Sequence, residues 1–199
     1  MTHYFDETPD VGSDVRTVDV ALTDVAFTMQ TDRGVFSHGH VDTGTALLLR
    51  EAPPPAATGH LLDLGCGSGA LALTLALRAP EAVVWAVDTN ERARHLTADN
   101  ARRNRLDNVR VRAPGAVPSD IGFTTIWSNP PIRIGKSALH DLMGGWLGRL
   151  DDSGTAVLVV QKHLGADSLQ RWLNEHGYPT RRLVSRAGFR LLESRRSSL

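Results

Sequence analysis

The feature that most constrains this 199-residue chain is the regular alternation of short apolar runs with amphipathic segments from residue 60 onward. The apolar runs have the length of buried strands and lie at 60–64, 83–87, 109–111, 123–127 and 155–160. Helical patterns lie between or after them at 70–79, 91–105, 137–150 and 166–175. Repeated strand–helix units build a parallel sheet covered by helices on both faces. The sequence therefore predicts an α/β fold with a doubly wound, mainly parallel sheet.

The two ends of the chain depart from this repeat. Near the carboxyl end, residues 182–185 and 189–193 flank Ala187-Gly188 as an antiparallel hairpin. At the amino end, residues 15–22 and 25–31 form a second antiparallel pattern, followed by a helical pattern at 42–51 and three prolines. We predict that residues 1–52 form a small β-rich extension packed on a core domain of residues 53–199.

Composition narrows the class of protein. The chain is 41% hydrophobic and has a formal net charge of zero, which excludes a uniformly basic nucleic-acid binder. Its single cysteine excludes an intramolecular disulfide and a cysteine-based zinc cage, and His38 and His40 have no third ligand nearby in the sequence, so no metal is expected. No apolar run approaches the ~20 residues that span a bilayer, and the polar amino end is unlike a signal peptide. A cytoplasmic enzyme is the default expectation.

A glycine-rich loop follows the first strand of the repeat. The stretch Asp63-Leu64-Gly65-Cys66-Gly67-Ser68-Gly69 has the spacing G-x-G-x-G, whereas dinucleotide sites use G-x-G-x-x-G. Glycine allows tight turns and close approach to a ligand, and a carboxylate beside the loop suits a cation better than a pyrophosphate. Asp88 ends the next strand, where a carboxylate can accept from ribose hydroxyls. A cationic ligand with a ribose and no phosphate indicates S-adenosylmethionine; a turn without a ligand is the alternative.

The strand at 123–127 runs into Ser128-Asn129-Pro130-Pro131-Ile132. The two prolines fix φ and remove backbone donors, so the segment is rich in acceptors. The Asn129 side-chain oxygen and the Pro130 carbonyl can hold the N–H groups of an exocyclic amine and stabilise the charge that builds on its nitrogen. Ile132 can pack on the face of a base. The alternative is a segment that only ends a strand.

These motifs together resemble class I S-adenosylmethionine-dependent methyltransferases. More narrowly, they are similar to the methyltransferase small domain family, with its RsmC-like ribosomal RNA guanine-N2 methyltransferases and their single-domain relatives. The resemblance implies a Rossmann-like seven-stranded sheet. The matching segments are His3-Tyr4-Phe5, residues 31–37 (TDRGVFS), 41–45 (VDTGT), 63–69 (DLGCGSG), 128–136 (SNPPIRIGK), Gln161 with Gly165-Ala166, and Gly188-Phe189-Arg190.

The resemblance also assigns roles to residues. The target base would be held by the catalytic segment Asn129, Pro130, Pro131 and Ile132. Substrate contacts would come from Phe36, Arg133, Lys136, Lys162 and Arg190. The cofactor would be bound by Asp63, Gly65, Cys66, Gly67, Gly69, Asp88, Thr89, Asn129, Asp42, Gly44 and Thr45. For Phe36 and Thr45, a lid without ligand contact is the alternative.

The implied activity is methylation of a guanine exocyclic amine in ribosomal RNA, with S-adenosylmethionine as cofactor. The expected partner is ribosomal RNA or the small ribosomal subunit, bound by a monomer that lacks the family's second half. Arginines of the carboxyl-terminal segment could then contact phosphates, although a solvated surface is the alternative. One departure is Arg112-Ala113-Pro114-Gly115, where the family usually has an acid that reaches adenine. The other readings are methylation of a protein amide, DNA adenine or small molecule, and a non-catalytic RNA-binding or ribosome-assembly protein.

Overall fold

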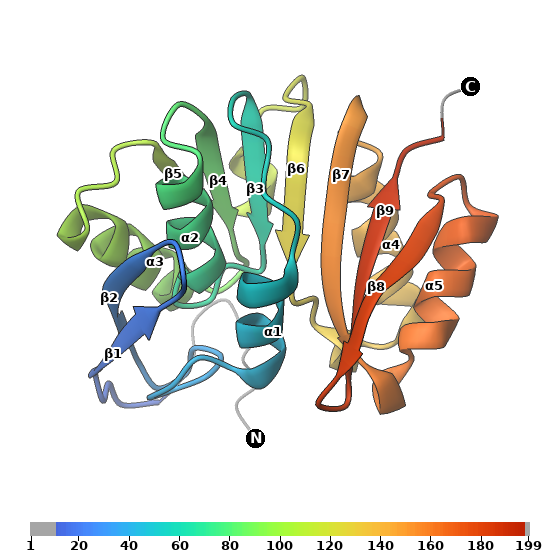
Figure 1. The fold of residues 1–199 in the computed structure, drawn as a ribbon. Helices are drawn as coiled ribbons and strands as arrows, with labels where there is room; N and C mark the ends of the chain where they lie inside the picture. The colour runs from blue at the N-terminus through green and yellow to red at the C-terminus, as the bar shows by residue number, and fades with distance from the viewer. Residues whose placement is uncertain (1–10, 198–199) are drawn as a thin grey trace.

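The computed structural model describes residues 11–197, so the His3-Tyr4-Phe5 segment lies outside the described residues. A seven-stranded sheet with the order β5-β4-β3-β6-β7-β9-β8 forms the centre of the protein (Figure 1). The strands β3, β4, β5, β6 and β7 are parallel, and β9 runs antiparallel to both β7 and β8. The predicted Rossmann-like fold class is confirmed.

The elements follow one another along the chain as the alternating pattern predicts. The strands are β1 (Arg16–Ala21), β2 (Ala26–Thr31), β3 (His60–Leu64), β4 (Val83–Val87), β5 (Val109–Arg112), β6 (Phe123–Ser128), β7 (Leu150–Gln161), β8 (Thr180–Arg186) and β9 (Phe189–Arg195). The helices are α1 (Thr43–Glu51), α2 (Ala70–Arg78), α3 (Glu91–Arg103), α4 (Lys136–Leu147) and α5 (Ala166–Glu175). Short 3-10 turns are η1 (Pro114–Ala116), η2 (Ile132–Ile134) and η3 (Lys162–Leu164).

The bounds of β7 differ most from the prediction. The strand begins at Leu150 rather than at residue 155, and α4 ends before it at Leu147. The segment Asp151-Asp152-Ser153 has the composition of a turn, but Leu150 pairs with Phe123 of β6 and an irregularity in register follows. Pairing with β6 at Leu150 and again from Thr155 therefore extends the strand across an irregular stretch whose polar side chains are exposed.

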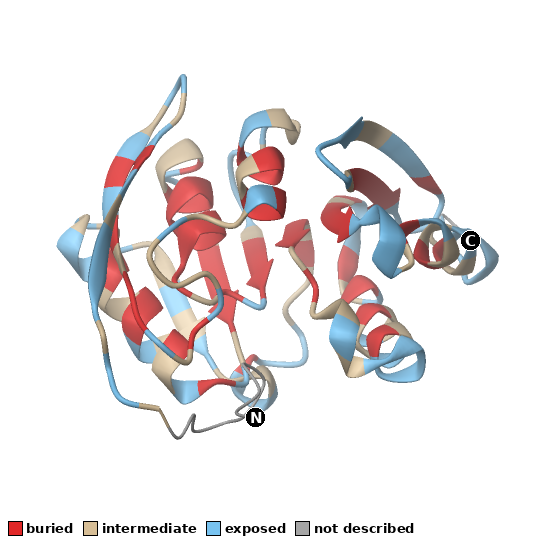
Figure 2. Ribbon diagram, turned by 90° about the horizontal axis from the view of Figure 1, so that it is seen from below, coloured by how far each residue is buried: buried red, intermediate tan, exposed pale blue. Residues whose placement is uncertain are grey.

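Alternate side chains of the central strands enter two separate cores. Leu61 and Val84 pack with α1 and α2 on one face, whereas their neighbours Leu62 and Trp85 pack with α4 and α5 on the other. Successive side chains of a strand point to opposite faces, so near-continuous apolar runs are needed when both faces are covered. Figure 2 shows the resulting concentration of buried residues along the central strands and the inner sides of the helices.

The β1–β2 hairpin is a separate two-stranded sheet, and Asn100 of α3 ties it to the main fold. The Asn100 side-chain oxygen accepts from the Gln30 backbone N–H at 2.7 Å, and its amide donates to the Gln30 carbonyl at 2.8 Å. The same amide donates to the Ser68 carbonyl of the glycine-rich loop at 2.9 Å. The Asn100 side chain therefore pairs with both backbone groups of Gln30, as the backbone of a neighbouring strand would. It also connects β2 to the glycine-rich loop. Across residues 11–197, no helix has the length and apolar character required to cross a membrane.

Candidate active site

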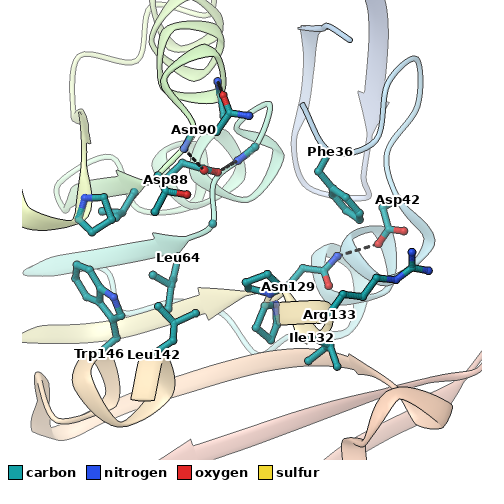
Figure 3. Close-up of a pocket in the computed structure, with 18 of the residues that line it drawn as sticks. Phe36, Asp42, Leu64, Asp88, Asn90, Asn129, Ile132, Arg133, Leu142 and Trp146 are labelled. Carbon is teal, nitrogen blue, oxygen red and sulfur yellow. Dashed lines mark hydrogen bonds between the residues drawn. The ribbon is translucent and has the colours of Figure 1, made fainter. Parts of the chain in front are cut away.

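A cavity of about 450 Å³ opens at the carboxyl ends of β3, β4 and β6 (Figure 3). The strand order reverses between β3 and β6, because β4 and β5 lie on one side of this pair and β7 on the other. Open α/β sheets bind ligands at such switch points. The predicted site residues that line the cavity are Phe36, Asp42, Gly65, Gly67, Asp88, Thr89, Asn129, Pro130, Pro131, Ile132 and Arg133.

The glycine-rich loop forms one wall of the cavity. Gly65 and Gly67 have φ angles of 81° and 53°, which glycine adopts without the steric cost that a side chain incurs. A Cβ built on Gly65 would meet no atom of the described part of the chain within 4 Å, so a ligand can approach the backbone there. Gly69 differs, because its Cβ would approach Leu73 and Thr97 at 3.0 Å. Gly65 and Gly67 thus form a cradle that fits a nucleoside, whereas Gly69 allows α2 to pack against α3.

Asp88 stands at the end of β4 and holds the loop in place. One carboxylate oxygen accepts from the Gly67 N–H at 3.0 Å and the other from the Asn90 N–H at 2.9 Å. Burial raises the pKa of Asp88, and the hydrogen bonds from Gly67 and Asn90 oppose that shift. A half-buried carboxylate at the cavity wall has the acceptor capacity that ribose hydroxyls require.

Asp63 lies beneath the loop rather than on the cavity wall. Its side chain is fully buried, and one oxygen accepts from the Ala72 N–H in the first turn of α2 at 2.9 Å. Burial, with a smaller contribution from the negative charge of Asp88, raises the pKa of Asp63 to about 8. Asp63 therefore links β3 to the amino end of α2 from beneath the loop.

Asn129 follows β6, the strand next to β3, and lines the cavity beside the glycine-rich loop. Its side-chain amide donates to an Asp42 carboxylate oxygen at 2.9 Å and to the Thr45 hydroxyl at 3.1 Å. The side-chain oxygen of Asn129 is therefore the group left to accept from a ligand. The Pro130 carbonyl already accepts from the Ile132 N–H at 2.9 Å, which uses one of its two lone pairs. The segment is thus the rigid, acceptor-rich turn that its two prolines predict.

The stretch Asp42-Thr43-Gly44-Thr45 starts α1 and supports Asn129 from behind. Asp42 caps the helix by accepting from the Gly44 and Thr45 N–H groups. Gly44 does not line the cavity. A Cβ added at this position would lie 2.8 Å from the ring of Phe189, so the glycine leaves room for Phe189, which lines the cavity. Thr45 and the buried Cys66 line an adjoining hollow of about 40 Å³. This hollow shares Phe36, Asp42, Gly65, Gly67 and Asn129 with the main cavity, so Thr45 and Cys66 lie beside the cofactor position that the resemblance implies.

The end of the cavity near Leu64 is apolar, and the sequence motifs did not predict it. Leu142 and Trp146 of α4 line it near Leu64 (Figure 3). Pro114 of η1 also lines the cavity. The spacing of Leu142 and Trp146 puts them on one face of a helix. That spacing was visible in the sequence, but it does not distinguish a core contact from a ligand contact. Apolar side chains can pack against the faces of an adenine ring system.

The predicted basic contacts divide into two groups. Arg133 is exposed and lines the cavity mouth beside Phe36, whose side chain is also exposed. Lys136 and Lys162 are exposed but do not line the cavity, and Arg190 is buried in an ion pair with Asp167. The carboxyl-terminal arginines are partly neutralised, since Arg181 pairs with Glu193, Arg182 with Asp167 and Arg186 with Glu51. Among residues 11–197, no group of three metal-ligating side chains occurs.

Comparison with known proteins agrees with this geometry. A family model described as the methyltransferase small domain matches residues 26–193, most of the chain. The chain belongs to the methyltransferase small domain family. It is a class I methyltransferase, and the predicted family and the S-adenosylmethionine cofactor are confirmed.

The relatives differ in length. The chain is 37% identical to the uncharacterized protein YbxB of Bacillus subtilis (strain 168), over 87% of this chain and 88% of that protein. It is 31% identical to ribosomal RNA small subunit methyltransferase C of Ectopseudomonas mendocina (strain ymp), over 95% of this chain and 57% of that protein. The solved 16S rRNA N2 methyltransferase RsmC of T. thermophilus, in complex with AdoMet and guanosine, is 24% identical with a TM-score of 0.76. That match covers 94% of this chain and 52% of the solved chain, so the chain spans about half the length of these RsmC relatives.

Proposed function

We propose that this protein transfers a methyl group from S-adenosylmethionine to the exocyclic N2 amine of a guanine in RNA of the small ribosomal subunit. The observation that carries the proposal is the Asn129 side chain on the cavity wall, whose amide is held by Asp42 and Thr45 so that its oxygen remains to accept from a substrate. S-adenosylmethionine supplies an electrophilic methyl group when bound. The sequence relatives named for small-subunit RNA methylation support this choice of substrate.

The cavity has distinct places for the two reactants. The ribose hydroxyls would be held by Asp88, the adenine by the apolar end at Pro114, Leu142 and Trp146, and the rest of the cofactor by the backbone at Gly65. The acceptor base would enter from the mouth at Phe36 and Arg133. Pro114 supplies no carboxylate at the adenine end, so apolar contact replaces the acid that the family usually has there.

An arylamine is a poor nucleophile because its lone pair is delocalised into the ring. The Asn129 oxygen and the remaining lone pair of the Pro130 carbonyl would each accept one N–H and orient the nitrogen toward the methyl group. As positive charge develops on nitrogen, these two acceptors stabilise it more than they stabilise the ground state. Ile132 packs against the base. No covalent nucleophile is needed, and the proton leaves to solvent after transfer.

The mouth of the cavity is suited to RNA. Phe36 offers an aromatic side chain for base stacking, and Arg133 offers a cation for the backbone. The target base would have to be unpaired or turned out of a helix to reach Asn129. We propose that the enzyme works in the cytoplasm on the ribosomal RNA or the assembled subunit.

The test is Asn129→Ala, assayed with tritiated S-adenosylmethionine on small ribosomal subunits from a strain that lacks the gene. Loss of an oriented acceptor is expected to lower kcat by roughly a hundredfold while calorimetry shows unchanged cofactor binding. Unchanged turnover would remove Asn129 from the mechanism.

The same assay separates the alternatives. Label is offered in parallel to protein, DNA and metabolite fractions, and methylated nucleotides are mapped by mass spectrometry. Label in protein, DNA adenine or a small molecule would overturn the RNA assignment. Calorimetry that detects no binding of S-adenosylmethionine would favour a non-catalytic RNA-binding or ribosome-assembly role.

A further inference from the structure

We infer that Asp42 and Thr45 are positioning residues that lock the orientation of the Asn129 side chain and thereby restrict the methyl acceptor to a group that carries N–H. The inference rests on the proposed function, because it concerns the same cavity. It assigns to the first turn of α1 a role in the choice of substrate.

The lock depends on the two N–H groups of a single side-chain amide. One is donated to Asp42 Oδ2 at 2.9 Å and the other to Thr45 Oγ1 at 3.1 Å. A flipped amide would place its oxygen 2.9 Å from the same carboxylate oxygen, acceptor against acceptor. The Thr45 hydroxyl can adapt to a flip by donating its proton, but an ionised carboxylate cannot. Asp42 therefore sets the direction of the amide, and Thr45 completes its hydrogen bonds.

Asp42 cannot easily turn away from Asn129. The oxygen that accepts from Asn129 also accepts from the Gly44 N–H at 2.9 Å and from the Thr45 N–H at 3.1 Å, as the cap of α1. Moving the carboxylate would leave the amino end of the helix without its cap. Thr45 is buried, which shields its hydrogen bond from competing water. The same carboxylate oxygen therefore caps α1 and holds the Asn129 amide in place. Figure 3 shows its hydrogen bond with Asn129.

The consequence concerns the chemistry of the substrate. With both N–H groups occupied, Asn129 presents only an acceptor to the cavity. An amine or amide nitrogen meets that acceptor with a hydrogen bond, whereas a ring nitrogen or carbonyl oxygen meets it with repulsion. A freely rotating amide would accept either kind of group. The lock therefore supports selection of N–H-bearing acceptors by penalising the wrong partner.

Thr45→Val and Thr45→Ser form a matched pair that tests the inference. Valine keeps the shape of the side chain but removes the acceptor for Asn129, whereas serine retains the hydroxyl. With small ribosomal subunits and tritiated S-adenosylmethionine, Thr45→Val is expected to lower kcat roughly three- to tenfold, with KM and the cofactor Kd within about twofold of wild type. Thr45→Ser is expected to recover most of that loss.

A second pair covers the case in which the valine variant folds poorly. Asp42→Ser keeps a helix cap but is too short to reach Asn129, whereas Asp42→Asn keeps an oxygen in the same place. The serine variant is expected to lose at least as much kcat as Thr45→Val at saturating cofactor, and the asparagine variant much less. Thermal unfolding of all four variants shows whether the fold is retained.

The decisive measurement combines Thr45→Val with Asn129→Ala. If Thr45 acts through Asn129, the valine substitution has no further effect on the residual turnover of Asn129→Ala. An equal loss in both backgrounds, or a Thr45→Val enzyme as fast as wild type while Asn129→Ala is impaired, would overturn the inference and leave the proposed function standing. Absence of methyl transfer by the wild-type protein would overturn both.

Discussion

Replacing Asp63 with asparagine should remove a large part of the pH dependence of this protein's stability. The carboxyl group is fully buried, one of its oxygens has no hydrogen-bond partner among residues 11–197, and its pKa is raised from 3.8 to about 8. Between these two values the folded protein binds a proton at Asp63 that the unfolded chain has released. The contribution of Asp63 therefore favours the folded state most strongly below about pH 4, and this contribution falls as the pH rises toward about 8.

The size of the effect follows from the difference between the two pKa values. Each unit corresponds to ~1.36 kcal/mol, so a difference of about four units sets a ceiling of ~6 kcal/mol. Relaxation around the ionised group and water entry reduce such penalties in real proteins. We expect wild type to lose ~2–4 kcal/mol relative to Asp63→Asn between about pH 5 and about pH 8. Asparagine keeps an oxygen for the Ala72 N–H and cannot ionise.

Urea unfolding at intervals across that pH range measures this difference directly. Subtracting the two stability curves cancels the contributions of groups that the proteins share. Asp152→Asn, at an exposed position of β7, is the control for removal of one negative charge from the chain. A wild-type curve that runs parallel to the Asp63→Asn curve would show that Asp63 stays ionised in the folded protein, which would refute the reasoning from burial.

Two further substitutions test the extension and the cofactor wall. Asn100→Ala removes the three hydrogen bonds that join Gln30 and Ser68 to α3 and leaves the buried Ser68 carbonyl and the part-buried Gln30 backbone without these partners, so urea unfolding should show a loss of ~2–4 kcal/mol. A loss below ~0.5 kcal/mol would contradict the assigned role. Asp88→Asn replaces the carboxylate with a weaker acceptor, so calorimetry should show S-adenosylmethionine binding weakened by roughly tenfold or more. An unchanged Kd would mean that Asp88 only holds the Gly67 loop.

The central sheet could be predicted because its signals are local. Leu61-Leu62 and Val84-Trp85 are apolar at consecutive positions, which is required when both faces of a strand are buried, and the bounds of β3, β4 and α5 agree with the prediction. The end of β7 near Leu150 could not be predicted in this way. Leu150 joins the strand by pairing with Phe123 of β6 ahead of an irregular polar stretch, and local composition does not reveal that partner.

The sequence by itself determined the family, the glycine cradle and the stiffness of the turn after Asn129, because glycine spacing and paired prolines restrict the backbone wherever they occur. Only the tertiary structure decided what the polar side chains do. Asp63 is two residues from Gly65 in the chain, yet β3 carries its carboxylate beneath the loop. Asp42 is 87 positions from Asn129, yet the packing of α1 brings their side chains within 2.9 Å. The direction of the Asn129 amide depends on that contact, because an amide is oriented by its partners and not by its neighbours in sequence.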